Sequence, residues 1–187
     1  MSYLKELLKN YKQTGTILGS SNVLTKALLD LKSNADKRFV IEIGPGKGEF
    51  TQKLIETYDN YLGIEINHRF YDELWSKYGK EYFILGSASN LVNIVKDKDI
   101  GLVSCVINCI PISLASDELN YKIVKSSYEV LQQGGIFKGY NYFQTQVVPK
   151  TTRFKKNLKK VFDCEVDQSF VGLNIPPAII YKVQKSF

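Results

Sequence analysis

Residues 40–50 read VIEIGPGKGEF, an apolar run that ends at three closely spaced glycines. The apolar residues predict a buried strand at 38–43, and the spacing of apolar residues over 49–58 predicts a helix directly after the glycines. Gly44 and Gly46 lack a Cβ, so the backbone between the two elements can turn sharply and approach a ligand closely. A strand, a glycine-rich turn and a helix in this order are typical of nucleotide-binding α/β folds.

The rest of the chain continues the alternation of strands and helices. Further strands are expected at 61–66, 81–85, 100–107, 135–142, 161–170 and 178–183. Further helices are expected at 22–31, 68–78, 90–96, 117–132 and 151–160. This order predicts a Rossmann-like, doubly wound α/β fold with a mostly parallel sheet of seven strands. The length of 187 residues indicates a single domain, with an N-terminal helical extension over 1–34 and the Rossmann-like core over 35–187.

Acidic residues around the glycines help to choose between two classes of cofactor. A dinucleotide site needs Gly-x-Gly-x-x-Gly facing a pyrophosphate, but Glu49 stands at the third glycine position and would repel phosphate. Glu42, just before the glycines, favours a ligand with a positive end. Glu65, at the end of the second expected strand, suits a carboxylate that accepts both hydroxyls of an adenosine ribose. S-adenosylmethionine carries a sulfonium and an ammonium and no phosphate, so it fits these charges better than NAD.

Composition excludes several other classes of protein. The chain has one histidine, His68, and three cysteines, which argues against a metal site, a Ser-His-Asp hydrolase and a disulfide framework. The odd number of cysteines suits a reducing cytoplasm. There is no long apolar stretch and no apolar signal-peptide centre at the N-terminus, so we expect a cytoplasmic protein without a membrane span.

Basic residues are concentrated near both ends of the chain. The formal charge is +6, and the segment 151–160 holds five bases and no acid. Leu4, Leu7, Leu8 and Tyr11 recur at helical spacing among lysines, which predicts a short basic amphipathic helix. Each of these features is explained by a solvated or core-packed helix. The functional alternative is a surface that binds polyanions, either anionic lipid headgroups or nucleic acid.

Several segments resemble a known group of enzymes. Residues 40–48 and Glu65 are similar to the cofactor-binding motifs of class I S-adenosylmethionine-dependent methyltransferases. More narrowly, the chain resembles the bacterial phospholipid N-methyltransferase family, which methylates phosphatidylethanolamine. The segments that carry this resemblance are 7–21 (LLKNYKQTGTILGSS), 63–67 (GIEIN), 86–88 (GSA), 139–142 (GYNY) and 174–178 (NIPPA). The last motif is specific to the family, whereas the glycine loop indicates only the superfamily.

The resemblance implies a set of site residues. Those expected to bind the cofactor are Glu42, Gly44, Pro45, Gly46, Gly48, Glu65, Ile66, Ser87, Ala88 and Asn108. Those expected to act in catalysis are Asn108, Tyr140 and Tyr142. The Asn108 carbonyl oxygen would orient an acceptor amine, and the two tyrosines would stabilise a cation through their rings. The alternatives are an asparagine that caps the following loop and tyrosines that pack in the core.

Three departures from the family pattern leave the acceptor open. Residues 108–111 read NCIP where the family usually has Ser-Gly-Leu-Pro, Gly139 replaces an expected glutamine, and Ser87 stands where many methyltransferases carry aspartate. The NCIP run partly resembles the Asn-Pro-Pro-Tyr motif of nucleic-acid N-methyltransferases.

Three functions therefore compete. The first is methylation of phosphatidylethanolamine by an enzyme bound peripherally to the inner, anionic face of the membrane. The second is methylation of an adenine in ribosomal RNA, although RNA adenine dimethylases carry an additional helical domain and only about forty-five residues follow Tyr142 here. The third is membrane binding without catalysis, against which the complete cofactor motif argues. We expect the first.

Overall fold

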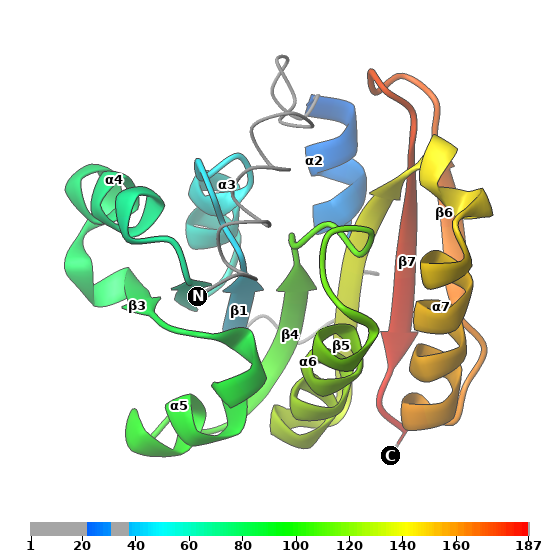
Figure 1. Cartoon of the computed structure of the whole chain (residues 1–187). Coiled ribbons are helices and arrows are strands. Elements are labelled where there is room, and N and C mark those ends of the chain that lie inside the picture. The colour runs from blue at the N-terminus through cyan, green and yellow to red at the C-terminus, as the bar shows by residue number, and fades with distance from the viewer. Residues whose placement is uncertain (1–21, 31–37, 187) are drawn as a thin grey trace.

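The computed structural model describes residues 22–30 and 38–186, which form one sheet with helices on both faces (Figure 1). The strand order is β3-β2-β1-β4-β5-β7-β6. Strands β1 to β5 run parallel, and β7 runs antiparallel to both of its neighbours, β5 and β6. The predicted fold class, a doubly wound and mostly parallel sheet of seven strands, is confirmed.

The element bounds follow the predicted alternation closely. The strands are β1 (Phe39–Ile43), β2 (Asn60–Glu65), β3 (Phe83–Leu85), β4 (Val103–Asn108), β5 (Leu131–Tyr142), β6 (Asp167–Val171) and β7 (Ala178–Gln184). The α-helices are α2 (Asn22–Leu29), α3 (Thr51–Thr57), α4 (His68–Tyr78), α5 (Leu91–Asp97), α6 (Asp117–Val130) and α7 (Pro149–Phe162). Three short 3-10 helices are η1 (Lys80–Tyr82), η2 (Ala88–Asn90) and η3 (Phe143–Val147).

Part of the predicted N-terminal extension lies outside the described residues. The helix expected at 22–31 is present as α2 over its first eight residues. The predicted amphipathic helix of the first twelve residues and the segment 7–21 are not among the residues described. Within the described residues, no helix combines the length and the apolar character that crossing a bilayer requires.

The central strands are apolar on both faces because helices cover both faces. Successive residues of β1 point to opposite sides. Val40 packs in a core cluster with Leu24 of α2 and Leu54 of α3, whereas Ile41 packs in the cluster on the other face, with Leu158 of α7. All five of these side chains are fully buried. The sheet is therefore fixed from both sides, and the loops at its edge are left to form the site.

The predicted strand at 161–170 is wrong over its first half. Phe162 is the last residue of α7, Asp163 follows in the left-handed conformation with φ 50°, and β6 begins only at Asp167. Phe154, Leu158 and Phe162 are fully buried at intervals of four residues, so the apolar run continues a helical stripe rather than starting a strand.

The boundary between α6 and β5 also differs from the prediction. The helix expected to run to residue 132 ends at Val130, because Leu131 already pairs with Val103 of β4. Gly134, with φ 75°, lies within β5, close to a register shift in the β4–β5 pairing. Gly134 therefore allows an irregular backbone within β5, and it does not terminate α6.

Candidate active site

A cavity of about 350 Å³ lies at the carboxyl ends of the parallel strands, where the strand order reverses between β1 and β4 (Figure 1). This position and this volume are typical of small-molecule sites in doubly wound sheets. Its wall comes from the loops after four strands and from helices α4 and α6. The lining residues include Gly44, Gly46, Glu65, Ile66, Phe70, Gly86, Ser87, Ala88, Cys109, Ile110, Pro111, Leu119, Lys122 and Ile123.

The glycine loop after β1 has a backbone that only glycine adopts easily. Gly44, Gly46 and Gly48 have φ of 70°, 58° and 78°, all in the left-handed region. A Cβ built on Gly44 would lie 2.6 Å from Cγ1 of Ile110, a residue that lines the cavity. The glycine loop therefore lies tightly against the loop after β4. The Ile110 side chain, which is part of the cavity wall, occupies the space that a side chain on Gly44 would need.

Glu65 fixes the glycine loop and also lines the cavity. Its Oε2 accepts a hydrogen bond from the Gly46 amide at 3.0 Å, and its Oε1 accepts from the amides of Ile66 at 2.9 Å and Asn67 at 2.8 Å. Burial raises the pKa of Glu65, and these three amides oppose that rise. A carboxylate offers roughly four acceptor sites, so one remains for a ribose hydroxyl in the cavity. That is room for one of the two hydroxyls expected, and the role of Glu65 in holding adenosine stays a prediction.

Glu42 lies one side chain behind the cavity wall. It is fully buried and does not line the cavity. Its Oε2 accepts from the Tyr61 hydroxyl at 2.6 Å and from Thr51 Oγ1 at 2.7 Å, while Sγ of Cys109 lies 3.5 Å from Oε1. Burial raises the pKa of Glu42, and these hydrogen bonds oppose the rise. Glu42 therefore joins β1 to β2 and α3, and its expected contact with the positive end of the cofactor stays a prediction.

Asn108 points away from the cavity in this structure. Its side chain is buried, and its Nδ2 donates to the hydroxyl of Tyr181 at 2.9 Å. Its Oδ1 accepts from the Ile110 amide at 3.4 Å, as expected for an asparagine that caps the following loop. The next three residues of the chain, 109–111, line the cavity in its place.

Tyr140 and Tyr142 form an aromatic pair at the carboxyl end of β5. They point to the same face of the strand, and their ring centroids are 5.8 Å apart with planes at 79°. The Tyr140 ring also meets the edge of Phe50, which follows the glycine loop, at 5.5 Å. Both tyrosines are half-buried and lie outside the lining of the cavity. Their expected catalytic role stays a prediction.

Of the residues expected to bind the cofactor, six line the cavity: Gly44, Gly46, Glu65, Ile66, Ser87 and Ala88. Glu42, Pro45, Gly48 and Asn108 do not line it. Sequence reasoning missed Cys109, Ile110 and Phe70 as lining residues, and it treated Leu119 and Ile123 only as apolar positions of a helix. Helical spacing marks a buried face, but it does not distinguish a face on the core from one on a cavity. Among the described residues, no three His, Cys, Asp or Glu side chains form a group that could hold a metal.

Comparison with known proteins gives a family-model match over the first part of the chain. A family model described as ribosomal RNA adenine dimethylase matches residues 2–85, which include the glycine loop and Glu65. Together with the fold, this match supports an S-adenosylmethionine-dependent methyltransferase of the class I type. No curated protein sequence matches it.

Solved structures resemble this methyltransferase over most of its length. The O-methyltransferase TomG from Streptomyces achromogenes, in complex with S-adenosylmethionine, has a TM-score of 0.71 and 12% identity, covering 100% of this chain and 91% of that one. An O-methyltransferase from Bacillus cereus, in complex with S-adenosylhomocysteine, has a TM-score of 0.66 and 15% identity, covering 99% and 91%. At such low identities the likeness establishes the fold.

A longer protein also shares the fold. A candidate S-adenosylmethionine-dependent methyltransferase from Streptococcus mutans has a TM-score of 0.62 and 12% identity, and it matches 86% of this methyltransferase. The chain spans only 47% of the length of that protein. The cavity with its glycine loop and Glu65 suits S-adenosylmethionine, the ligand present in the TomG structure.

Proposed function

We propose that the chain is an N-methyltransferase that acts on the primary amine of a phospholipid headgroup, phosphatidylethanolamine. The observation that carries this proposal is the meeting of two segments, 139–142 and 174–178. These are the segments that resemble the phospholipid N-methyltransferase family on the acceptor side. Tyr142 pairs with Ala178, and the Phe143 amide donates to the carbonyl of Pro177 at 2.7 Å.

The joined segments form one wall beside the end of β5. Asn174 is buried, and its Nδ2 donates to the carbonyl of Pro176 at 2.7 Å, which holds the turn in shape. Tyr140 and Tyr142 stand next to it and present aromatic faces that attract an ammonium or a sulfonium. An aminoalkyl group needs such a wall, since its nitrogen becomes cationic as methyl groups are added.

The chain's own residues have a limited task in this reaction. Bound S-adenosylmethionine supplies a methyl group that is already activated, so the protein has mainly to orient a neutral amine and exclude water. The ammonium of the headgroup must first lose a proton to give the neutral amine that attacks the methyl group. Water is the acceptor of that proton in this proposal.

A second candidate is methylation of an adenine amino group in ribosomal RNA, which the match to the ribosomal RNA adenine dimethylase model favours. The match ends at residue 85, so it covers the cofactor-binding half and not the segments around β5. After β5, residues 143–186 include η3, α7, β6 and β7. These elements are two strands of the sheet and two helices beside it. The neighbouring segments 143–148 and 168–178 contain no lysine or arginine with which to hold phosphates.

Radiolabelled S-adenosylmethionine distinguishes the two acceptors. The protein is incubated with either phosphatidylethanolamine vesicles or ribosomal RNA, and the label in each fraction is measured. We expect label in the lipid and none in the RNA, and a Glu65→Ala variant should label the lipid more slowly when S-adenosylmethionine is limiting. Label in the RNA alone would overturn the proposal in favour of the second candidate.

A further inference from the structure

Apolar side chains gather where β5 ends and where β6 turns into β7. Among the residues the structure describes, eleven large apolar side chains are exposed, and five of them lie at this edge: Phe143, Val147, Phe170, Leu173 and Ile175. We call these five residues the apolar cap. Val147, Leu173 and Ile175 are 87%, 80% and 72% exposed, more than any of the other six. A cluster of this kind on a protein surface marks a site of interaction.

The cap is held in place by the structure beneath it. The rings of Phe143 and Phe170 meet edge to face with centroids 5.5 Å apart, which ties η3 to β6. The buried amide of Asn174 bonds the carbonyl of Pro176 and so fixes the turn that carries Leu173 and Ile175. The apolar side chains therefore project outward from a braced turn.

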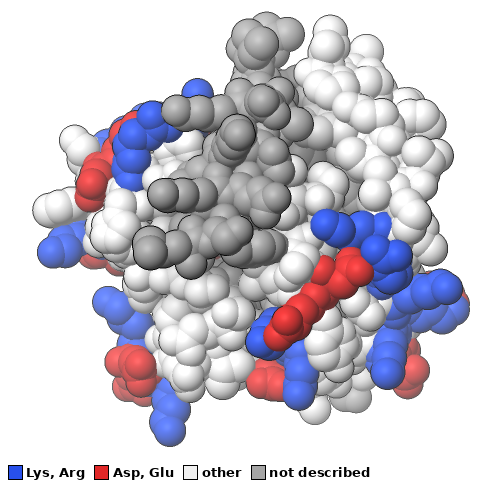
Figure 2. All heavy atoms as spheres, viewed as in Figure 1, with Lys and Arg blue, Asp and Glu red and all other residues white. Residues whose placement is uncertain are grey.

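Charge around the cap follows a definite pattern. The segments 143–148 and 168–178 carry no charged side chain. Figure 2 shows this as an uncharged block at the upper right, and below it lie lysine and arginine side chains with some acidic side chains among them. The first turns of α7, directly after η3, supply Lys150, Arg153, Lys155 and Lys156. We call these four residues the basic border. Lys155 Nζ donates to Gln146 Oε1 of η3 at 2.5 Å, and this bond connects the basic border to the helix that carries Phe143 and Val147 of the cap.

We propose that the apolar cap docks on an anionic bilayer, with its side chains in the headgroup–acyl boundary and the first turns of α7 facing anionic headgroups. An apolar surface bordered by lysines matches that boundary in both polarity and charge. A nucleic acid would meet no cation on the cap itself. The choice of a bilayer rests on the proposed function, because the cap adjoins Tyr142 and docking brings the end of β5 to the headgroups.

Vesicle sedimentation tests the cap without any need for catalysis. The variant Val147→Asp/Leu173→Asp should bind phosphatidylcholine–phosphatidylglycerol vesicles about tenfold more weakly than the wild type, or weaker still. Leu102→Asp is the matched control, since Leu102 is 55% exposed and precedes β4 at the opposite end of the sheet. Equal binding by the double variant and the wild type would overturn the proposal.

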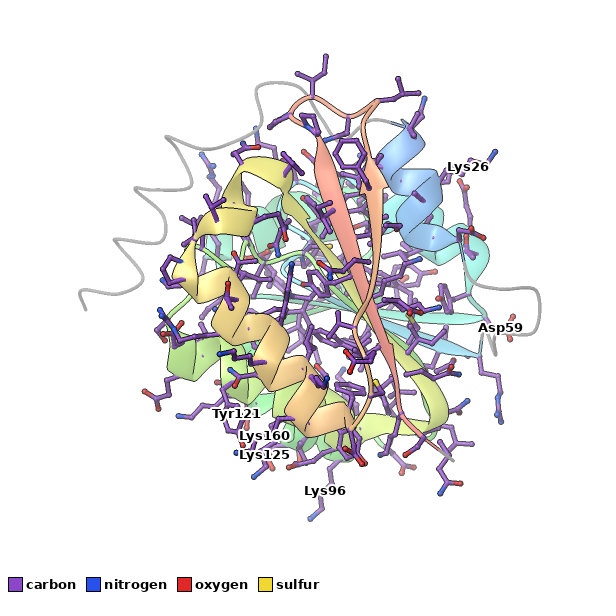
Figure 3. The ribbon with its side chains drawn as sticks, turned by 90° about the vertical axis from the view of Figure 1, so that its right-hand side faces the viewer. Lys26, Asp59, Lys96, Tyr121, Lys125 and Lys160 are labelled. Carbon is purple, nitrogen blue, oxygen red and sulfur yellow. The ribbon has the colours of Figure 1, made fainter. Side chains whose placement is uncertain are left out.

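The basic border has its own pair of variants. Lys156→Glu should weaken binding to anionic vesicles and leave binding to pure phosphatidylcholine unchanged. Lys96 lies at the end of the molecule opposite the β6–β7 turn (Figure 3), so Lys96→Glu should leave binding to both kinds of vesicle unchanged. An equal loss in both variants would mean that net charge alone matters, and the proposed orientation would be wrong.

Two further measurements separate docking from the proposed reaction. Methyl transfer to a dispersed short-chain phosphatidylethanolamine needs no bilayer, so the double variant should retain the wild-type rate there and lose activity on vesicles. If the wild type binds vesicles through the cap but labels no phosphatidylethanolamine, docking stands and the proposed acceptor fails. If the wild type ignores vesicles and the double variant converts a dimer to a monomer in light scattering, the cap joins two copies of the chain and docking on a bilayer is refuted.

Discussion

The side chains of Asn108 and Tyr181 meet across the strand that separates them. Asn108 Nδ2 on β4 donates to the Tyr181 hydroxyl on β7 at 2.9 Å, passing over Gly139 of β5. A Cβ on Gly139 would lie 2.2 Å from Tyr181 Oη and 2.6 Å from the Asn108 carbonyl oxygen. The glycine found where the phospholipid N-methyltransferase family has glutamine thus makes room for this bond.

Removing only the hydroxyl of Tyr181 tests the energy of that bond. The ring is fully buried against Phe137 and Phe154, so Tyr181→Phe keeps the packing and leaves the Asn108 amide with one weak contact, to the Ile110 carbonyl at 3.4 Å. We expect the free energy of unfolding in urea to fall by about 1–3 kcal/mol, the cost of an unsatisfied buried donor. Tyr121→Phe, on an exposed tyrosine of α6, should leave it unchanged.

Loss of the Glu65 carboxylate should weaken binding of S-adenosylmethionine. A hydrogen bond to a charged group contributes about 1.5–3 kcal/mol, so Glu65→Ala should lower the affinity by roughly tenfold or more in calorimetry. Glu73→Gln on the exposed face of α4 is the control. Because Glu65 also holds three backbone amides, the melting temperature must be measured beside the affinity. Unchanged affinity in a folded variant would mean that Glu65 does not hold the ribose.

A methyl group added to Gly44 should damage the site. Gly44→Ala places an L-residue at φ 70° and a Cβ within 2.6 Å of Ile110, so both backbone and cavity wall must shift. We expect a loss of about 1–3 kcal/mol in unfolding free energy, together with weaker cofactor binding. Gly101→Ala is a matched control, since nothing lies within 4 Å of its Cβ position. Equal behaviour of the two variants would contradict this account of the glycine loop.

The sequence predicted most of the fold because its patterns are local. An apolar run such as 38–43, followed by glycines, marks a strand and a turn wherever it occurs, and the strand–helix alternation then indicates a parallel sheet. The error at 161–170 has the same origin. Val161 and Phe162 form an apolar run too short to show whether its spacing is that of a helix or of a strand. The packing of Phe162 against Tyr128 and Phe137 keeps these residues in the helix.

The site was less predictable because it depends on contacts between distant strands. Gly46 and Glu65 were named from motifs, and the structure joins them by a hydrogen bond. The loop-capping alternative for Asn108 came from the sequence, but its bond to Tyr181 did not, since Tyr181 lies in another strand and matches no motif. Cys109 lines the cavity simply because it follows Asn108 at the strand end.

The buried carboxyl of Glu42 should make stability depend on pH. Its pKa in the folded protein is raised above the ordinary value of 4.5, chiefly because burial disfavours the charged form. The folded state therefore holds this proton more tightly than the unfolded state. Its contribution to stability is fully present below pH 4.5 and is lost as the pH rises through the folded pKa.

The variant Glu42→Gln removes this titration and keeps an oxygen that accepts from Tyr61 and Thr51. We expect the unfolding free energy of the wild type to fall relative to the variant as the pH rises above 4.5, in urea titrations at several pH values. Glu65 is present in both proteins, and its negative charge adds to the rise in the pKa of Glu42. In Glu118→Gln the sign should reverse, because the hydrogen bond from Lys122 lowers the pKa of Glu118 and its contribution is lost as the pH falls. A difference between wild type and Glu42→Gln that does not change with pH would show that Glu42 is no harder to ionise in the fold than in the unfolded chain.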